Sequence, residues 1–461
     1  MKSLFFKHIA STPKALSTTV IWLGLLLGGC NMTGSAQQAN IQIFPIASDG
    51  FAGSSVNVLA GVKQTLFTSS NYQYAAYYNG NAHLVLAKRS LSQHEWQIHT
   101  TEFTGNVNDA HNHISLVVDG DGYLHIAWDH HNSQLKYAQA VAPGSLQLKQ
   151  MPMLAKSGNE GDAKEASVTY PQFYRLNDGA LLFAYRDGGS GQGNLVLNRY
   201  DLATKRWQRL HNSLIDGEGK RSAYWDMTLD KNNVLHLAWI WRDTPDVASN
   251  HDIAYARSLD NGQTWQDLSG QGYQIPINAT NAKLAKRIPT RHKLMNPPVV
   301  AADDQSNPFI ASYWANSPSD IPRYHVIYST NRATWSEVNA PEPAGNFELG
   351  GMGTKNPPIS RAVLLVQQQP NSTALHLIYR DDFNKGQVIA QSLSDITKPQ
   401  WNTQVLVHKN MGAWEPSLDI AMWHQQQQAS LLLQQVGQND GNDAQSLQLA
   451  PKPIELLTWK P

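Results

Sequence analysis

The 461-residue sequence has a single cysteine, Cys30, and is poor in charge. One thiol permits neither a disulfide within the chain nor a zinc site built from several cysteines. Charged residues make up 16% of the chain, and 36 basic and 36 acidic residues give a formal net charge of zero. This composition argues against a disordered chain or a coiled coil. It also lacks the basic excess by which proteins bind nucleic acids, so no nucleic-acid partner is expected.

Long hydrophobic runs are equally scarce, and the one at the amino terminus is short. It covers residues 20–27, follows Lys2, Lys7 and Lys14 without any acidic residue, and leads into Gly28-Gly29-Cys30. A basic region, a short apolar run and small residues, in that order, are typical of a secretory signal. The run is too short for a permanent membrane-spanning helix.

The end of this segment resembles a bacterial lipobox, in which the cysteine is acylated and becomes the first residue of the mature chain. The resemblance implies a lipoprotein signal peptide over residues 1–29, a lipid such as palmitate on Cys30, and a polar tether over residues 30–40. The protein would then be anchored to a membrane of a bacterial cell envelope, at the outer membrane or cell surface. The alternative is ordinary cleavage, with Cys30 incidental. Without residues 1–29 the chain keeps 33 basic and 36 acidic residues, a net charge of −3.

The chain is rich in residues that suit short strands joined by turns, with 14 Trp, 17 Tyr, 32 Gly and 23 Pro. From about residue 75 one pattern recurs: a strand of alternating apolar residues, a second strand, and a turn that leads to Trp. Clear copies begin at Leu124, Leu235 and Leu375. Seven copies of about 60 residues, with four short strands each, predict an all-β, seven-bladed β-propeller over residues 41–461. An apolar period of two disfavours a helical solenoid.

One copy carries a more specific motif. Residues 258–265, with Asp260, Gly262, Thr264 and Trp265, match the Asp box of BNR-repeat propellers, a hairpin turn in which the Asp side chain bonds backbone amides. Residues 330–335 are a degenerate relative. An Asp box is strong evidence for the fold, but it lies on the periphery of a blade and says little about function.

Three polar stretches stand at predicted strand ends, where propellers usually bind ligands. They are residues 108–115, 128–132 and 170–191. Because they fall within three neighbouring repeats, they belong to adjacent blades and can face one cavity. Together they supply imidazoles, a phenol and a guanidinium, without a matching pair of carboxylates.

These residue types favour proton abstraction over hydrolysis. Glycoside hydrolysis needs two carboxylates that flank the bond, and a zinc hydrolase needs three protein ligands with carboxylates that orient them. Beside a uronate, an arginine can instead offset the charge of the carboxylate. A Tyr or His can remove the C5 proton, and the same or another group can protonate the departing O4. That reaction is β-elimination, the reaction of polysaccharide lyases.

Further motifs follow one another over nearly the whole mature chain: His111-Asn112, His130-His131, and residues 170–173, 185–195, 223–225 and 350–361. With these motifs the chain resembles the BNR-repeat family that contains the ulvan lyases, chiefly polysaccharide lyase family 25 and its relative family 24. The resemblance implies an enzyme that cleaves ulvan, a sulfated polysaccharide of green algae, beside its uronic acid residues, leaving unsaturated uronate ends.

The resemblance also implies roles for individual residues. It places the catalytic groups at His111, Tyr170 and Arg186, with Arg186 offsetting the charge of the uronate. Residues expected to contact substrate are His131, His130, Asn112, Tyr224, Lys355 and Arg361. Three points stay open: which of His111 and Tyr170 is the base, whether His113 replaces His111, and whether His130 or His131 faces the cavity. We favour His131, because adjacent residues of a strand point to opposite faces.

No cofactor is expected, and a structural metal ion has no support beyond the fact that some relatives hold one. The expected partner is the sulfated, uronate-containing polymer, bound by a monomer. Two other functions compete with the lyase. The Asp box alone suggests a sialidase-like glycosidase, although the Arg-Ile-Pro motif expected ahead of it is missing. A non-catalytic lipoprotein that captures sugars for uptake would need the aromatic residues but no base.

Overall fold

The structure is a computed structural model, which describes residues 40–59, 64–154, 163–441 and 445–461. The predicted signal peptide, Cys30 and nearly all of the predicted tether lie outside these residues. Residues Ala39–Pro461 form one compact unit. Within the described part of the chain, no helix combines the length and the apolar character needed to cross a membrane.

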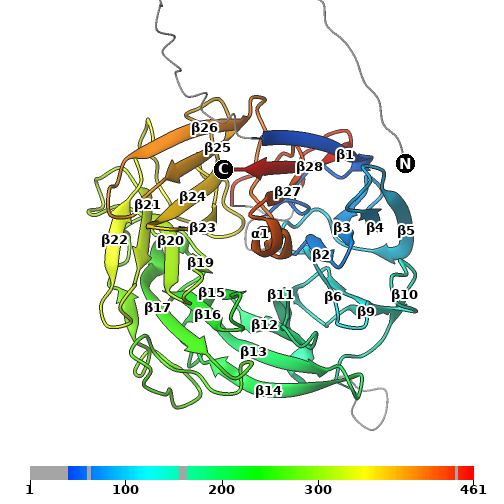
Figure 1. Cartoon of the computed structure of the whole chain (residues 1–461), viewed down its shortest axis with the longest axis horizontal. Coiled ribbons are helices and arrows are strands. Elements are labelled where there is room, and N and C mark those ends of the chain that lie inside the picture. Colours follow the sequence, from blue (N-terminus) through cyan, green and yellow to red (C-terminus); the bar gives the residue numbers. More distant parts are fainter. Residues whose placement is uncertain (1–39, 60–63, 155–162, 442–444) are drawn as a thin grey trace, which may run out of the picture. The chain divides into compact units, whose positions relative to one another are not determined.

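Seven antiparallel sheets of the described residues surround a common axis like blades (Figure 1), which confirms the predicted seven-bladed β-propeller. The first blade consists of β2 (Leu66–Ser69), β3 (Tyr72–Tyr78), β4 (His83–Ser90) and β5 (Gln97–Thr104). The second consists of β6 (Ile114–Val118), β7 (Leu124–Trp128), β9 (Tyr137–Ala140) and β10 (Leu148–Gln150). The third consists of β11 (Val168–Arg175), β12 (Leu181–Gly189), β13 (Gln192–Asp201) and β14 (Arg206–Ile215), with β8 (His131–Ser133) paired to β11.

The remaining blades follow in chain order. The fourth consists of β15 (Ser222–Leu229), β16 (Leu235–Arg242), β17 (Asn250–Ser258) and β18 (Leu284–Lys286). The fifth consists of β19 (Val299–Ala302), β20 (Pro308–Trp314), β21 (Arg323–Tyr328) and β22 (Ser336–Asn339). The sixth consists of β23 (Val363–Gln369), β24 (Ser372–Asp381), β25 (Gln387–Leu393) and β26 (Trp401–Val407).

The seventh blade closes the ring with both ends of the unit. It consists of β27 (Ala429–Leu433), β28 (Lys452–Lys460) and the first strand of the unit, β1 (Asn40–Gly50). β1 pairs with β28 from Asn40 opposite Lys460 onward, as the blue and red strands of Figure 1 show. This pairing ties the first blade to the last, so the ring has no open side.

Buried hydrogen bonds explain why the repeated motif forms a turn followed by a strand. In the second blade, one Oδ of Asp119 accepts from the backbone N–H groups of Asp121 and Tyr123, both at 2.9 Å, and so forms the turn. Its other oxygen lies 3.2 Å from Nε2 of His125, whose Nδ1 lies 2.6 Å from the Tyr137 hydroxyl. The same arrangement recurs in the fourth blade with Asp230, His236 and Tyr255. His125 and His236 therefore tie the turn to the strands of their own blade.

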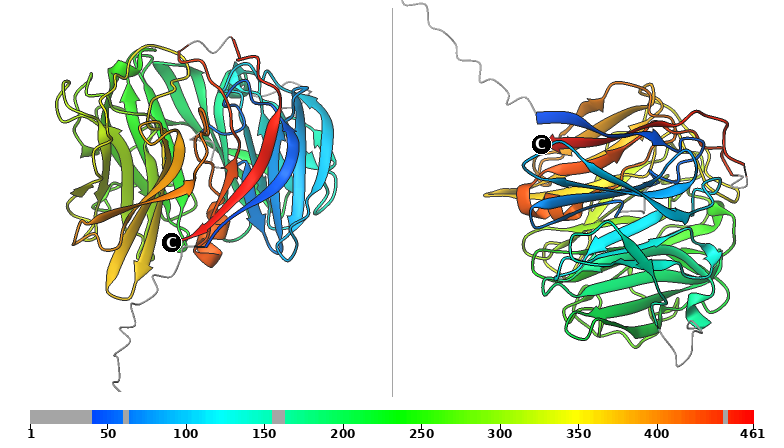
Figure 2. Two further views of the ribbon diagram at one scale, coloured as in Figure 1. Left: turned by 90° about the horizontal axis from the view of Figure 1, so that it is seen from above. Right: turned by 90° about the vertical axis from the view of Figure 1, so that its right-hand side faces the viewer.

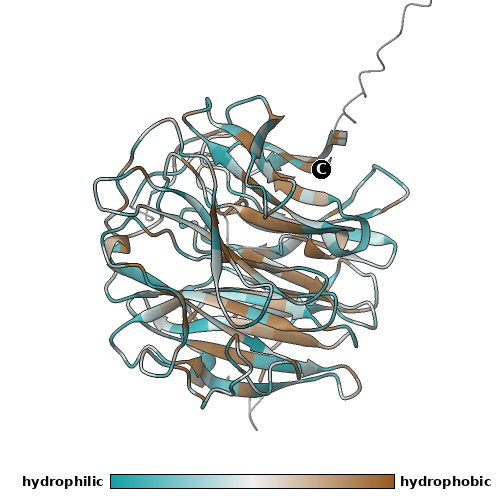
Figure 3. Cartoon of the chain, turned by 60° about the vertical axis from the view of Figure 1, so that its left-hand side comes forward, coloured by the Kyte–Doolittle hydropathy of each residue, from teal (hydrophilic) through white to brown (hydrophobic). Residues whose placement is uncertain are grey.

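The core lies between neighbouring blades, where buried apolar side chains pack together. Figure 3 shows hydrophobic residues along the strands and mainly hydrophilic residues in the loops. The predicted Asp box sits at a hairpin of the fourth blade. Asp260 accepts from the backbone N–H of Thr264 at 2.9 Å and from its hydroxyl at 2.6 Å, and Trp265 is buried. In the degenerate copy, Asn331 accepts from the backbone N–H of Thr334 at 3.0 Å.

The inner strands connect two cavities at opposite ends of the axis. Tyr170 on β11 and Tyr224 on β15 line one cavity, whereas Arg175 and Thr228, farther along the same strands, line the other. The helix α1 (Ile420–Gln426) lies beside the second cavity, at one end of the ring (Figure 2). The predicted site residues gather at the first cavity, away from α1.

Candidate active site

The first cavity has a volume of about 160 Å³ and collects seven of the nine predicted catalytic and substrate-contacting residues. These seven are His111, His131, Tyr170, Arg186, Tyr224, Lys355 and Arg361. The three polar stretches of the sequence therefore meet in one place. Among the described residues that line the cavity, none carries a carboxylate.

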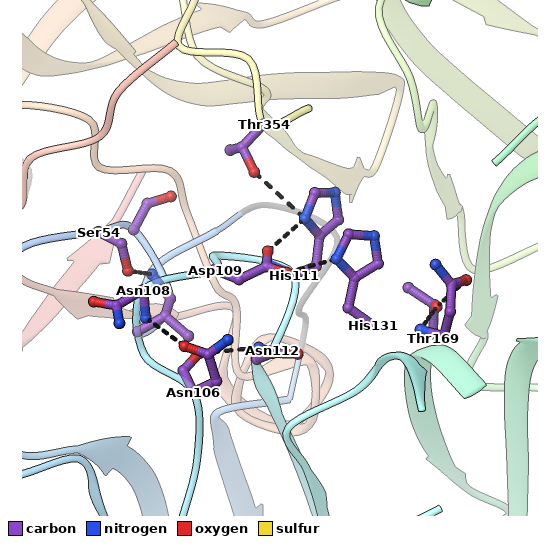
Figure 4. Close-up of polar contacts among 12 residues, drawn as sticks. Ser54, Asn106, Asn108, Asp109, His111, Asn112, His131, Thr169 and Thr354 are labelled. Atoms are coloured by element: carbon purple, nitrogen blue, oxygen red, sulfur yellow. Dashed lines mark hydrogen bonds and ion pairs between the residues drawn. The ribbon is translucent and has the colours of Figure 1, made fainter. Parts of the chain in front are cut away.

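Asp109 holds two of these residues from behind (Figure 4). Its Oδ1 lies 2.8 Å from Nδ1 of His111 and its Oδ2 lies 2.5 Å from Nδ1 of His131. The two imidazoles are stacked, with ring centroids 4.1 Å apart. A carboxylate that accepts from Nδ1–H leaves Nε2 as the basic nitrogen of each neutral ring. One side chain thus fixes the tautomer of both histidines.

The local sequence explains how Asp109 reaches both rings. Its Oδ1 also accepts from the backbone N–H of His111 at 3.0 Å, a turn that Asp forms readily two residues ahead of its partner. Burial alone would raise the pKa of Asp109, but the hydrogen bonds from His111 and His131 outweigh it and hold that pKa well below its ordinary value. The carboxylate is therefore ionised near neutral pH in the folded protein.

Tyr170 owes its position to an irregularity in β11. The pairing of β11 with β12 shifts between Thr169 and Gln172, and Tyr170 has a positive φ of 56°. Pro171 follows and has no N–H to give to the ladder. A bulge of this kind re-aims a side chain at the cost of some backbone strain. It turns Tyr170 into the cavity, with its ring centroid 5.9 Å from that of His111.

Arg186 is buried, with 2% of its surface exposed, and its guanidinium carbon lies 5.0 Å from the centre of the Tyr170 ring. Nε donates to the Gly188 carbonyl and Nη2 to Oδ1 of Asn132, both at 3.0 Å. The glycine at 193 gives the side chain its space, because a Cβ there would lie 2.7 Å from Cγ and Cδ of Arg186. Gly193, in the glycine-rich stretch, therefore leaves the space that the Arg186 side chain occupies.

The phenols of Tyr170 and Tyr224 differ in acidity. Burial raises the pKa of Tyr170 to about 12, although the Arg186 charge opposes that rise. Burial acts in the same direction on Tyr224, but Arg242 and Arg186, with a hydrogen bond to Ser190, lower its pKa below the ordinary value. Tyr170 therefore holds its proton more tightly than Tyr224 does.

Arg242 is a cavity residue that the sequence analysis missed. It ends β16, is 6% exposed, and lies against Tyr224, with its guanidinium carbon 4.1 Å from the ring centre. A signal for it exists in the sequence. An aromatic residue, Arg and Asp stand in sequence near the end of the second strand of three blades, at positions 185–187, 241–243 and 379–381. Arg242 thus occupies the same repeat position as Arg186, one blade further on.

Lys355 and Arg361 line the cavity with their charges already matched. Lys355 forms an ion pair with Asp440. Nη1 of Arg361 lies 2.9 and 3.0 Å from the two carboxylate oxygens of Glu415. Their predicted contact with substrate stays a prediction.

Two predicted substrate contacts do not reach the cavity, and the structure corrects them. His130 is fully buried, and its Nε2 accepts from the backbone N–H of Lys136 at 2.7 Å. Asn112 is buried and donates to the Asn106 carbonyl at 3.0 Å (Figure 4). Neither lines the cavity. Both were chosen from their place beside a site histidine, but neighbours in sequence leave the backbone in different directions.

The choice between His111 and His113 is one of chemistry, because both line the cavity. Burial and the nearby His111 lower the pKa of His113 to about 3, and its buried Nδ1 has no partner among the described residues. His113 is therefore a weak base. His111 has the carboxylate of Asp109 to stabilise its protonated form, which makes it the better proton acceptor.

Asp109, His111 and His131 also form the one group of ligand atoms, within the described residues, that is spaced to hold a metal ion. Each oxygen of Asp109, however, meets an Nδ1 directly at hydrogen-bond distance. Each carboxylate oxygen is thus engaged by a ring nitrogen, and the geometry is that of a hydrogen-bonded Asp–His pair of contacts.

Known proteins resemble this chain in sequence and in fold. The sequence profile of the BNR repeat-containing family matches residues 72–341. An ulvan lyase, long isoform, of Alteromonas sp. is 27% identical over 187 residues, which is 30% of this chain and 18% of that protein. A short isoform from Alteromonas sp. (strain LOR) is 40% identical over 57 residues, 12% of this chain and 11% of that protein. The matches thus span less than a fifth of these relatives.

Solved structures share the fold. The crystal structure of polysaccharide lyase Uly1 superposes with a TM-score of 0.66 at 14% identity, covering 91% of this chain and 99% of that one. A PL25 ulvan lyase bound to -[GlcA(1-4)Rha3S]- superposes with a TM-score of 0.62 at 12% identity, covering 90% and 95%. At such identities these likenesses establish the propeller, and the profile match over more than half of the sequence establishes the family. The chain belongs to the BNR repeat-containing family.

Proposed function

We propose that the protein is a polysaccharide lyase that cleaves ulvan by β-elimination beside its uronic acid residues. One observation carries this proposal: the cavity unites imidazoles, phenols and guanidinium groups, and its described lining has no carboxylate. Glycoside hydrolysis needs a pair of carboxylates at the bond, and the described lining of the cavity does not supply them. The ulvan lyases among the relatives support the substrate class.

The geometry suits each step of the elimination. Arg186 binds the uronate carboxylate and offsets the charge that develops as the C5–H bond breaks. His111, held by Asp109, accepts the C5 proton at Nε2. The C4–O4 bond then breaks, a C4=C5 double bond forms, and the departing O4 takes a proton. Tyr170 supplies that proton, because its raised pKa keeps the phenol protonated at neutral pH. His111 then releases the C5 proton to solvent and Tyr170 takes a proton back from solvent, so both groups regain their starting states.

The test is to incubate the purified chain with ulvan and to follow the ultraviolet absorbance of the unsaturated uronate. A lyase raises this absorbance, and the rise disappears in Tyr170→Phe and Arg186→Ala. New reducing ends without absorbance would show a glycosidase instead. Binding of ulvan without any cleavage would show a capture protein. Either of these two results overturns the lyase.

We further propose that the mature chain is a monomer anchored by a lipid on Cys30 in a bacterial cell envelope. The support is the order of the basic region, the apolar run and the Gly28-Gly29-Cys30 ending. Labelling of expressing cells with a palmitate analogue tests the anchor. Label in the native chain and none in Cys30→Ala is the expected result, and equal labelling of both would refute it.

A further inference from the structure

Two arginines of the cavity are buried without a carboxylate partner. Within the described part of the chain, neither Arg186 nor Arg242 forms an ion pair, and both guanidinium groups hydrogen-bond only to neutral partners. A buried charge is costly unless an opposite charge meets it. Lys355 and Arg361 on the same wall have Asp440 and Glu415. The two arginines without a carboxylate partner can therefore pair with anionic groups of a bound ligand.

The hydrogen bonds of both arginines leave matching donors free. Arg242 donates from Nε to Asn250 at 2.8 Å, from Nη1 to the Tyr224 hydroxyl at 3.0 Å, and from Nη2 to Asn296 at 2.6 Å. Arg186 likewise uses one N–H on each of its three nitrogens. Since a guanidinium has five N–H groups, each arginine keeps one on Nη1 and one on Nη2. Such a pair of donors suits an oxyanion.

Tyr224 separates the two cations. Its hydroxyl oxygen lies 3.4 Å from Nη1 of Arg186 and 3.0 Å from Nη1 of Arg242, so it stands between the guanidinium groups. The two arginines also stand near the ends of equivalent strands, β12 and β16, in adjacent blades. This arrangement favours two anions on neighbouring sugars over one carboxylate clamped by both arginines.

We propose that Arg242 is a second anion-binding residue, which binds a sulfate ester on the sugar next to the uronate held by Arg186. The proposal rests on the proposed function, because it takes the ligand to be a polymer with both charged groups. Arg242, whose charge is unmatched, then selects sulfated over unsulfated chains. Tyr224 keeps the two subsites apart and shares its hydroxyl with both.

The experiment compares oligosaccharides from native ulvan with the same oligosaccharides after chemical desulfation. Rates of cleavage and binding isotherms are measured for the wild-type chain, Arg242→Gln, Arg242→Lys and Arg186→Gln. Lys398→Gln, a change of an exposed lysine, is the matched control for loss of a positive charge. Circular dichroism and the unfolding midpoint show whether each variant folds. Arg242→Lys keeps the buried charge, so it serves if Arg242→Gln is unstable.

The proposal predicts a loss that depends on the sulfate. Arg242→Gln lowers kcat/KM on the sulfated substrate by about 10- to 100-fold, the usual effect of losing a charged hydrogen-bonded pair. Its loss on the desulfated substrate is at least about tenfold smaller, because the partner anion is already absent. Arg242→Lys falls between, since it lacks the paired donors. Arg186→Gln loses activity on both substrates.

Failure of this proposal differs from failure of the proposed function. Equal losses of Arg242→Gln on both substrates, with cleavage by the wild type intact, would overturn the sulfate subsite and show that both arginines hold the uronate. No cleavage by the wild type would overturn the lyase, and the isotherms then decide the subsite alone. The sulfate subsite is supported if the wild type prefers to bind sulfated oligosaccharides and Arg242→Gln loses this preference. An unchanged preference in Arg242→Gln refutes the subsite.

Discussion

Replacing Asp109 by Asn tests whether one carboxylate controls both histidines of the site. The wild-type side chain accepts from two Nδ1–H groups, at 2.8 Å from His111 and 2.5 Å from His131. An amide has one oxygen that accepts and one NH₂ that donates. One of the two rings must then turn its Nδ1 into an acceptor and carry its proton on Nε2. If that ring is His111, the base is blocked.

The size of the effect follows from these contacts. General acid–base catalysis contributes about 10²- to 10⁴-fold, so misplacing the proton on the base lowers kcat by about 100-fold or more. The variant also exchanges two charged hydrogen bonds for neutral ones, which lowers the free energy of unfolding by about 2 kcal/mol. KM changes less, because Arg186 still holds the uronate.

The pH dependence separates this role from a merely structural one. The pKa of Asp109 is lower in the folded chain than its ordinary value, so its hydrogen bonds stabilise the fold above an ordinary aspartate pKa of about 4. That stabilisation is lost as the pH falls through the lowered pKa. The gap in unfolding midpoint between wild type and Asp109→Asn should therefore close in acid. The acidic limb of kcat against pH, which reports protonation of the base, should shift in the variant.

The control is Asp121→Asn, which removes the carboxylate of a half-exposed surface residue paired with Lys205. This variant should keep both the rate and the pH profile. The reasoning about Asp109 is refuted if Asp109→Asn keeps kcat within about twofold of the wild type with an unchanged pH profile, since the orienting role predicts about 100-fold.

Three further predictions use other parts of the structure. Tyr170→Phe should lower kcat by about 10²-fold or more while the chain stays folded, because it removes only the proton of the leaving-group acid; steady-state rates and circular dichroism check this. Treatment with EDTA should leave kcat unchanged, since the two ring protons already satisfy Asp109, and a loss restored by a divalent ion would contradict that view. Asp260→Ala should lower the free energy of unfolding by about 1 kcal/mol through lost turn hydrogen bonds, with no effect on kcat, as denaturant titration and rates would show.

The sequence predicts the blades well because each carries its pattern locally. An apolar period of two, a turn and a hairpin such as that of Asp260 are complete within a few tens of residues. The closing strand β1 is different, since its partner β28 lies at the other end of the unit. The first segment has no repeat of its own, so only the assembled ring shows that it completes the last blade.

The site residues also differ in how far the sequence alone predicts them. His111, His131, Tyr170 and Arg186 stand in polar stretches at strand ends, which adjacent blades bring together. The structure places His131 in the cavity and His130 in the interior, as alternation along an extended segment indicates.

Partners supplied from distant segments are not visible in the sequence. Glu415 neutralises Arg361 across 54 positions and Asp440 neutralises Lys355 across 85. Arg242 has no such partner in the described chain. Which of the three cations remains unmatched is decided by packing, because the partners of Lys355 and Arg361 lie far from them in the sequence.

The difference between paired and unpaired cations of the cavity matters for how a chain without positive net charge would bind a polyanion. The mature chain predicted from the sequence carries a charge of −3, so long-range attraction gives no help. Binding must then arise where cations are buried and unmatched, and the cavity supplies this at Arg186 and Arg242. Salt screens such partly buried groups less than it screens surface charge. A wall of this kind recognises the spacing of anions along the polymer, whereas a basic surface would respond only to their number.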